Sequence, residues 1–292
     1  MTVMSGHLTV RQIEQKASSM RENIIRMLEE AGSGHSAGPL GLSDLVATLY
    51  FGVMNYKPKN PDWNDRDYFF LSNGHCVPVQ YAAMAEAGFF DTKELLTLRK
   101  YGSRLQGHPE RTRLPGLENT SGPLGSGLSQ AAGVAYSLQY LDNAAHRFVY
   151  CVTGDGELNE GNIWEAAMFG GKYKLSQLIV FIDRNNIQID GNTEDVMPLE
   201  DLRGKWQSFG WHVQEIDGHN VESIIDAVGM AKAITNRPSV VITHTIPGKG
   251  VDFMEYDYRW HGMPPNHEQA KEALHELRTL RGKITHEGQK HE

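Results

Sequence analysis

Residues 147–161, RFVYCVTGDGELNEG, and residues 178–191, LIVFIDRNNIQIDG, decide the fold. Each stretch begins with an apolar run rich in β-branched residues and ends in glycine, asparagine and aspartate, which predicts a buried strand followed by a loop. Apolar residues at helical spacing predict helices over 129–141, 162–172, 199–209 and 221–234, and further strands are predicted over 68–71, 211–216 and 239–245. This alternation predicts an α/β fold, in which a mostly parallel sheet is flanked by helices on both faces.

The N-terminal part is predicted to be helical. Thr9 and Gln12 have the spacing of a capping box, and the helix that they begin should end at the glycines of residues 32–34. Further helices are expected over 42–51, with Ser43 as its cap, over 79–87 and over 93–100, before a long irregular stretch at 102–122. We expect one cofactor-binding domain over residues 1–265 and a charged helix or tail over residues 266–292.

Composition excludes several classes of protein. The 292 residues include 36 acidic and 28 basic side chains without a basic run, so nucleic acid is not an expected partner. The N-terminus lacks the apolar segment of a signal peptide, and the apolar run at 178–182 is too short to cross a membrane. Cys76 and Cys151 have neither metal-binding nor redox spacing, so we expect a reducing, cytoplasmic location.

Two loops at the strand ends carry residues suited to a metal ion and a diphosphate. Gly154 and Gly156 let the backbone approach a ligand closely, and Asp155 between them is a hard oxygen donor. The next loop offers the side-chain oxygen of Asn185 and the backbone carbonyl of Ile187. Loops after parallel strands meet at one edge of the sheet, and Mg²⁺ takes about six oxygens, some from phosphate and water. These loops therefore predict a Mg²⁺–diphosphate site.

Each loop taken alone has a simpler interpretation. A single Gly-Asp-Gly is usually a turn and a single Asn-Asn is usually a loop, but here they follow consecutive strands and lie 30 residues apart, from 155 to 185. The competing glycine segments fit phosphate less well. Residues 32–34 follow a predicted helix and lack the dinucleotide-binding spacing, and residues 248–250 lack the remaining residues of a P-loop.

Four histidines lie beside glycine and outside the predicted helices and strands: His35, His75, His108 and His261. Such a set is better explained by one convergent site than by four surface positions. Imidazoles exchange protons near neutral pH and hydrogen-bond to hydroxyl and phosphate groups. Zinc binding is the alternative, but the sequence has no His-Glu-x-x-His motif and no suitable cysteine pair.

The Gly-Asp-Gly and Asn-Asn loops together match the signature of thiamine diphosphate (ThDP) enzymes. With the histidine segments and TSGPLGSG at 120–127, residues 11–262 resemble the N-terminal portion of a transketolase. The sequence departs from many transketolases at 34–37, where Gly-His-Ser-Ala replaces Gly-His-Pro-Gly. The resemblance implies ThDP and Mg²⁺, or Ca²⁺ or Mn²⁺ in its place, and the transfer of a two-carbon ketol unit from a ketose (phosphate) to an aldose (phosphate).

The resemblance also implies roles for particular residues. It implies that His35, His108 and His261 act as catalytic residues in the substrate channel, and that His75 and His261 reach the diphosphate. The remaining cofactor-binding residues that it implies are Gly122 and Leu124 at the aminopyrimidine, Ile189 and Ile246 at the rings, Gly154 and Gly156 in the diphosphate loop, and Asp155, Asn185 and the Ile187 carbonyl at the metal, with Glu160 nearby.

The resemblance covers only part of a transketolase. The family's middle domain, which carries the glutamate that activates the pyrimidine, has no counterpart here. The chain thus resembles the N-terminal, ThDP-binding subunit of a split transketolase. We expect a partner subunit with the pyrimidine-binding and C-terminal domains, in a heterotetramer of two copies of this chain and two of the partner. Its interface is expected at residues 34–38, 122–127 and 159–169. The alternatives are a subunit of another ThDP-dependent enzyme and a non-catalytic cofactor-binding subunit.

Overall fold

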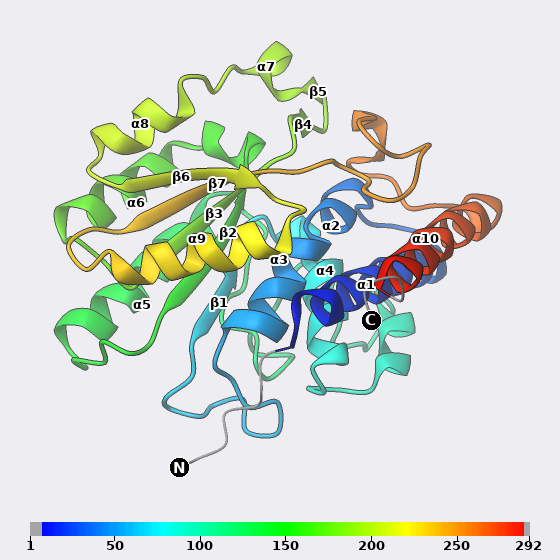
Figure 1. Cartoon of the computed structure of the whole chain (residues 1–292), viewed down its shortest axis with the longest axis horizontal. Helices are drawn as coiled ribbons and strands as arrows, with labels where there is room; N and C mark the ends of the chain where they lie inside the picture. Colours follow the sequence, from blue (N-terminus) through cyan, green and yellow to red (C-terminus); the bar gives the residue numbers. More distant parts are fainter. Residues whose placement is uncertain (1–7, 289–292) are drawn as a thin grey trace.

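The computed structural model describes residues 8–288 of the chain, and the burial of side chains as far as residue 279. Its centre is a five-stranded parallel sheet in the order β1-β2-β3-β7-β6 (Figure 1). The strands are β1 (Tyr68–Leu71), β2 (Val149–Gly154), β3 (Leu178–Arg184), β6 (His212–Asp217) and β7 (Ser239–His244). All four pairings are parallel, so the strands end at the same edge of the sheet. The predicted α/β fold is confirmed.

Helices cover both faces of the sheet because neighbouring residues of each strand point to opposite sides. In β2, Tyr150 and Val152 belong to one buried cluster, and Val149 and Cys151 belong to the other. The first cluster includes residues from α1 (Val10–Ala31), α2 (Ala37–Gly41), α3 (Ser43–Thr48), α4 (Val77–Glu86), α9 (Val221–Ala233) and α10 (His267–Gly288). The second includes residues from α5 (Ser126–Tyr140), α6 (Gly161–Lys172) and α8 (Leu202–Ser208).

Helix α1 begins and ends as its sequence predicts. The Thr9 side chain accepts a hydrogen bond from the Gln12 amide, and the Gln12 side chain accepts one from the Thr9 amide, which completes the capping box. Gly32 ends the helix in the left-handed conformation, with φ of 61°. Helix α10 packs against α1 (Figure 1). The boundary at residue 265 stays a prediction.

Two predicted helices differ from the structure. The helix expected over 42–51 is divided into α3 and a π-helix at Leu49–Val53, and α2 comes directly before it. Ser43 does not cap α3, because its hydroxyl donates to the Pro39 carbonyl. Residues 93–100 contain a 3-10 helix, Thr92–Thr97, instead of an α-helix. It ends before Arg99, which has φ of 62° and donates its backbone N–H to the Leu105 carbonyl.

Between β3 and α8 the chain leaves the sheet in an excursion, residues 187–200, which we call the flap. It contains β4 (Ile187–Gln188) and β5 (Gly191–Asn192), which pair antiparallel, and the short helix α7 (Thr193–Val196). Figure 1 shows the flap beyond the carboxyl ends of the strands. Within residues 8–288, no helix combines the length and the apolar character needed to cross a membrane.

Candidate active site

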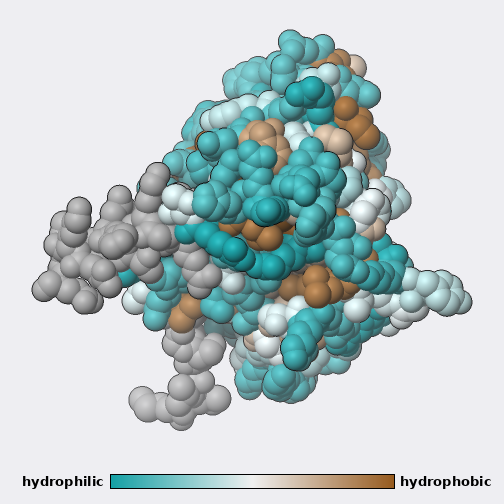
Figure 2. Space-filling model, turned by 90° about the vertical axis from the view of Figure 1, so that its right-hand side faces the viewer, coloured by the Kyte–Doolittle hydropathy of each residue, from teal (hydrophilic) through white to brown (hydrophobic). Residues whose placement is uncertain are grey.

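A cavity of about 280 Å³ lies at the carboxyl ends of the strands. Loops that follow β1, β2 and β3 meet there with segments around residues 35, 108, 122 and 261, as the parallel topology requires. Figure 2 shows the side of the molecule toward which the strands point, with small hydrophobic areas among largely hydrophilic surface. The cavity brings together most of the residues that the sequence indicated, namely His35, His75, His108, His261, Gly122, Leu124, Gly154, Asp155, Gly156, Asn185, Ile187 and Ile189.

Two indicated residues do not line this cavity. Glu160 is exposed and lies at the N-cap of α6. Ile246 is half-buried in the loop after β7, where its backbone N–H donates to Nε2 of His219 over 2.7 Å. Their contribution to cofactor binding stays a prediction.

Three of the histidines form a compact cluster. The ring centres of His35 and His75 are 4.9 Å apart, those of His75 and His261 are 5.0 Å apart, and those of His35 and His261 are 5.5 Å apart. The Ser36 hydroxyl donates to the Met263 carbonyl over 2.6 Å and so joins the segments that carry His35 and His261. Residues far apart in the sequence are thus fixed beside one another.

The histidines are held in the neutral form near neutral pH. Burial, together with the neighbouring His261, lowers the pKa of His35 to about 4. Burial also lowers the pKa of His75 well below its usual value and lowers the pKa of His261. His108 is more exposed, and partial desolvation together with the nearby Arg99 lowers its pKa. A neutral imidazole offers one donor and one acceptor, which suits polyhydroxylated ligands.

Asp155 is the buried carboxylate of the Gly-Asp-Gly loop. Its Oδ1 accepts from the Gly156 amide over 2.7 Å, and its Oδ2 accepts from the Asn186 amide over 2.8 Å and from Arg184 over 3.1 Å. Burial raises the pKa of Asp155, and Arg184 opposes that rise. Asn186 takes the left-handed conformation, with φ of 63°, which lets its amide reach Asp155. The loops after β2 and β3 are therefore joined at this carboxylate.

The oxygen ligands near Asp155 fit a divalent cation that is bound to a diphosphate. Asn185 donates its Nδ2 to Asp183 over 2.9 Å, which fixes the orientation of the amide, and its Oδ1 accepts from the Ile187 amide over 3.0 Å. One carboxylate, one amide oxygen and the Ile187 carbonyl are the kind of oxygen set that Mg²⁺ uses with phosphate. Among residues 8–279, no three His, Cys, Asp or Glu side chains are grouped to hold a metal, so the predicted ion would depend on these mixed donors.

Several polar atoms around the cavity lack a partner within the chain. They are Nδ1 of His35, Oδ1 of Asn73 and Nε2 of Gln188, all buried. Buried polar atoms without a partner are uncommon in folded proteins, and at a cavity they indicate a polar ligand. Gly122 also has open space where a side chain would begin. The residues present therefore fit a polar cofactor.

Glu157 is a site residue that no sequence pattern indicated. It is buried at the cavity and accepts three hydrogen bonds, from the Ser72 hydroxyl over 2.5 Å, from the Gly125 amide over 2.6 Å and from the Gly154 amide over 3.0 Å. Burial raises the pKa of Glu157, and these hydrogen bonds oppose the rise. The one sequence feature that could have indicated a role for Glu157 is its position two residues after Asp155. Two of its three partners, Ser72 and Gly125, are distant in the sequence, so the pattern could not indicate the role.

The family of the chain follows from comparison with known proteins. Residues 13–280 match the family model described as transketolase, thiamine diphosphate binding domain. The chain is 42% identical over 265 residues to a 6-deoxy-6-sulfo-D-fructose transketolase subunit of Clostridium sp. (strain MSTE9), covering 91% of this chain and 96% of that protein. It is 39% identical over 270 residues to an apulose-4-phosphate transketolase subunit of Phocaeicola vulgatus, and the match covers 92% of this chain and 95% of that protein.

Solved structures agree with the sequence comparison. The crystal structure of transketolase from Campylobacter jejuni superposes with a TM-score of 0.86 at 32% identity, over 92% of this chain. The chain spans 43% of the length of that transketolase, in contrast to nearly the whole length of the two subunits. The chain therefore belongs to the transketolase family and carries its thiamine diphosphate binding domain.

Proposed function

We propose that this chain is the ThDP-binding subunit of a two-chain transketolase, which moves a two-carbon ketol unit from a ketose (phosphate) to an aldose (phosphate) with ThDP and Mg²⁺. One observation carries the proposal: a single cavity gathers four histidines and the oxygen ligands Asp155, Asn185 and Ile187. A hydroxyl-binding set beside a cation–diphosphate set is what ketol transfer with this cofactor requires.

The donors after β2 and β3 would hold the cofactor. Asp155, Asn185 and the Ile187 carbonyl would bind the cation, and His75 and His261 would donate to the diphosphate. When bound, ThDP supplies the electron sink that lets a carbon–carbon bond next to a carbonyl break and form. The chain supplies orientation, because Asp155 and Asn185 are already held by hydrogen bonds to Asn186 and Asp183.

The other histidines would act on the sugar. His35 is half-buried beside His75 and His261, whereas His108 is exposed at the rim of the cavity. Each neutral ring can donate to one hydroxyl and accept from another, and it can move a proton at a hydroxyl oxygen during bond cleavage. We therefore propose His35 and His108 as catalytic residues, together with His261, which would contact both the diphosphate and the sugar. Residues of the partner subunit would determine which sugar is bound.

A second polypeptide would complete the site. The two similar proteins whose lengths this chain nearly matches are both named subunits, which supports a separate partner. Of the expected interface, residues 36–38 are buried within this chain and offer little surface. Residues 159–169 offer more, including Met168 and Phe169, and the neighbouring Tyr140 on α5 is also exposed. We propose that the partner covers α5 and α6 in a heterotetramer of two copies of this chain and two of the partner.

Two further proposals concern the whole chain. The cytoplasm is the proposed location, supported by Cys76 and Cys151, which are both free thiols in the structure. Residues 1–265 are proposed as the cofactor-binding domain, with residues 266–292 as an added segment.

A reconstitution experiment tests the proposed function. The chain is purified alone and together with a partner that carries the pyrimidine-binding and C-terminal domains, and ketol transfer is assayed with ThDP, Mg²⁺ and a panel of ketose donors. We expect turnover only with both chains, and native mass spectrometry should find two copies of each. Turnover by this chain alone would contradict the two-subunit proposal. A complex that binds ThDP but transfers no ketol unit would favour a different ThDP reaction or a non-catalytic role.

A further inference from the structure

The flap supplies part of the cavity wall but is lightly held. Ile187, Gln188 and Ile189 line the cavity, and the chain then turns outward through β5 and α7. Residues 195–198 are exposed, and Leu199 is the buried apolar side chain that ends this stretch. Few packed side chains therefore hold the flap in place, so its hydrogen bonds and ion pairs should determine its position.

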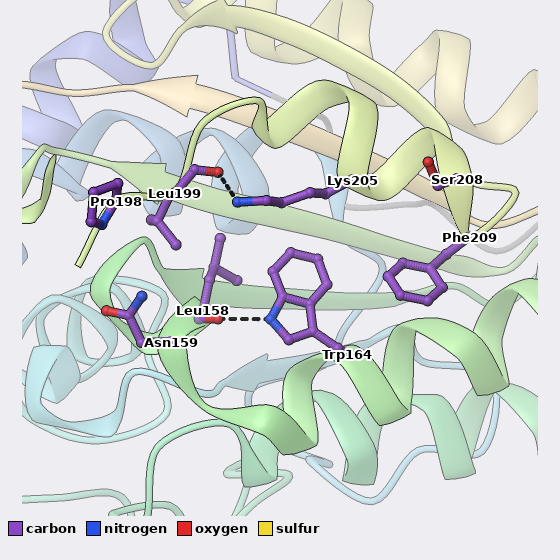
Figure 3. A pocket seen from close by; sticks show the side chains of 8 residues that line it. All are labelled: Leu158, Asn159, Trp164, Pro198, Leu199, Lys205, Ser208 and Phe209. Atoms are coloured by element: carbon purple, nitrogen blue, oxygen red, sulfur yellow. Dashed lines mark hydrogen bonds between the residues drawn. The ribbon is translucent and has the colours of Figure 1, made fainter.

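A second cavity, of about 490 Å³, lies under the far end of the flap (Figure 3). Pro198 and Leu199 form one wall, and Lys205 and Ser208 of α8 form another together with Phe209, which follows the helix. Figure 3 shows Lys205 reaching across to the Leu199 carbonyl, a hydrogen bond of 2.5 Å. The hollow leaves part of the flap without a packed surface beneath it.

Arg184 is a buried cation that contacts the flap. Its Nη2 donates to Glu194 over 2.6 Å and to Glu200 over 2.9 Å, while its Nη1 donates to Asp155 over 3.1 Å. The Arg184 side chain is only 4% exposed, whereas the side chains of Glu194 and Glu200 are 39% and 59% exposed. One guanidinium thus joins two carboxylates of the flap to the carboxylate of the Gly-Asp-Gly loop.

The glutamates also organise the flap itself. Glu194 accepts from the Leu199 amide over 3.1 Å, and Glu200 accepts from the Leu202 amide over 3.1 Å. On the cavity side, the Thr193 amide donates to the Asn186 carbonyl over 2.9 Å. A change at Arg184 would therefore reach both ends of the stretch 193–202.

From these contacts we infer that Arg184 is a positioning residue that couples the flap to Asp155. Ion pairs on the surface usually contribute little to stability, but removing one partner of a buried charge costs more because the other charge stays unpaired. Since Arg184 is buried, the loss of either Asp155 or the two glutamates should loosen the flap. The meaning of this coupling for catalysis rests on the proposed function, but the coupling itself can be measured without it.

Hydrogen exchange of the full chain without cofactor provides the test. The variants are Arg184→Met, the double variant Glu194→Gln/Glu200→Gln, and Asp155→Asn, which changes a residue outside the flap. Arg203→Met is the matched control, because Arg203 lies beside the flap and faces Glu215, an exposed partner. We expect the first three to speed exchange at amides 193–202 by about tenfold or more, and the control to leave it unchanged. Arg184→Lys should restore part of the protection.

Non-additivity separates coupling from general loss of structure. Asp155 also accepts directly from the Thr193 hydroxyl of the flap over 3.4 Å, so these comparisons are made in a Thr193→Val background. If Asp155 acts on the flap through Arg184, Asp155→Asn should speed flap exchange in that background and add little when Arg184→Met is also present. Exchange in β2 and β3 reports that each variant is folded. Unchanged flap exchange in Asp155→Asn, or equal effects in both backgrounds, would overturn the inference. Absence of ketol transfer would bear only on the proposed function.

Discussion

Replacing Glu157 by glutamine should destabilise the chain although the two side chains have almost the same shape. The carboxylate accepts from Ser72 and Gly125 at Oε1 and from Gly154 at Oε2. Glutamine has one terminal oxygen, so its NH₂ group must face at least one of these donors. The loop after β1, the turn before α5 and the end of β2 would lose part of their common anchor.

The magnitude follows from the bonds that are lost. A hydrogen bond to a charged group contributes about 1.5–3 kcal/mol, and a buried donor left without a partner costs about 1–3 kcal/mol. The neutral amide avoids part of the burial cost that raises the pKa of Glu157, which offsets some of the loss. We therefore expect the free energy of unfolding to fall by about 3 kcal/mol, and Tm to fall by about 6 °C or more.

Denaturant and thermal unfolding of the full chain at neutral pH measure this change. Glu160→Gln is the matched control, because Glu160 lies three positions away and is exposed, and its unfolding should stay within about 0.5 kcal/mol of wild type. If Glu157→Gln unfolded like the control, the three hydrogen bonds would not be important for stability and the anchoring role would be refuted.

Further predictions concern the cavity. Asp155→Ala should sharply lower ThDP affinity of the reconstituted complex, because it removes the one charged ligand proposed for the cation; unchanged affinity by calorimetry would exclude that role. His108→Ala should leave ThDP affinity intact and lower kcat by about 10²- to 10⁴-fold, and full turnover would argue against a catalytic role. His35 has a folded pKa of about 4, below its usual 6.5, so its contribution to stability is complete above pH 6.5 and is lost as pH falls toward 4. That loss is at most about 3 kcal/mol and smaller where solvent screens the ring, and a His35→Gln chain should show a flatter pH dependence of unfolding between pH 6.5 and 4; an identical profile would show that another group controls it.

Much of the fold could be predicted because the signals were local. The apolar runs of β2 and β3 and the capping box of α1 depend on neighbouring residues, and each lies where expected. Helix α5 begins at Ser126, three residues before the predicted start, because Gly125 takes a left-handed conformation with φ of 82°. The 3-10 helix at Thr92–Thr97 could not be predicted, since the contact of Arg99 with Leu105 decides where it ends.

The site was predictable to the extent that parallel strands place their loops together. That rule is enough to bring Asp155, Asn185 and His75 to one cavity. It could not indicate Glu157 or Arg184, since their roles depend on which side chain lies opposite. Arg184 sits beside Asn185 in the sequence, yet its partners Glu194 and Glu200 belong to a flap whose path no local pattern predicts.

The order of the strands has a consequence for how the chain folds during synthesis. β7 is the last strand to be made, but it lies inside the sheet between β3 and β6, and β6 pairs with the sheet only through β7. Until residue 244 has left the ribosome, β3 therefore has an unpaired edge, and β6 has no neighbour. Such non-local pairing slows folding and exposes strand edges that can aggregate. We expect nascent chains that stop before Ser239 to need chaperones, even though both cofactor loops have already been synthesised.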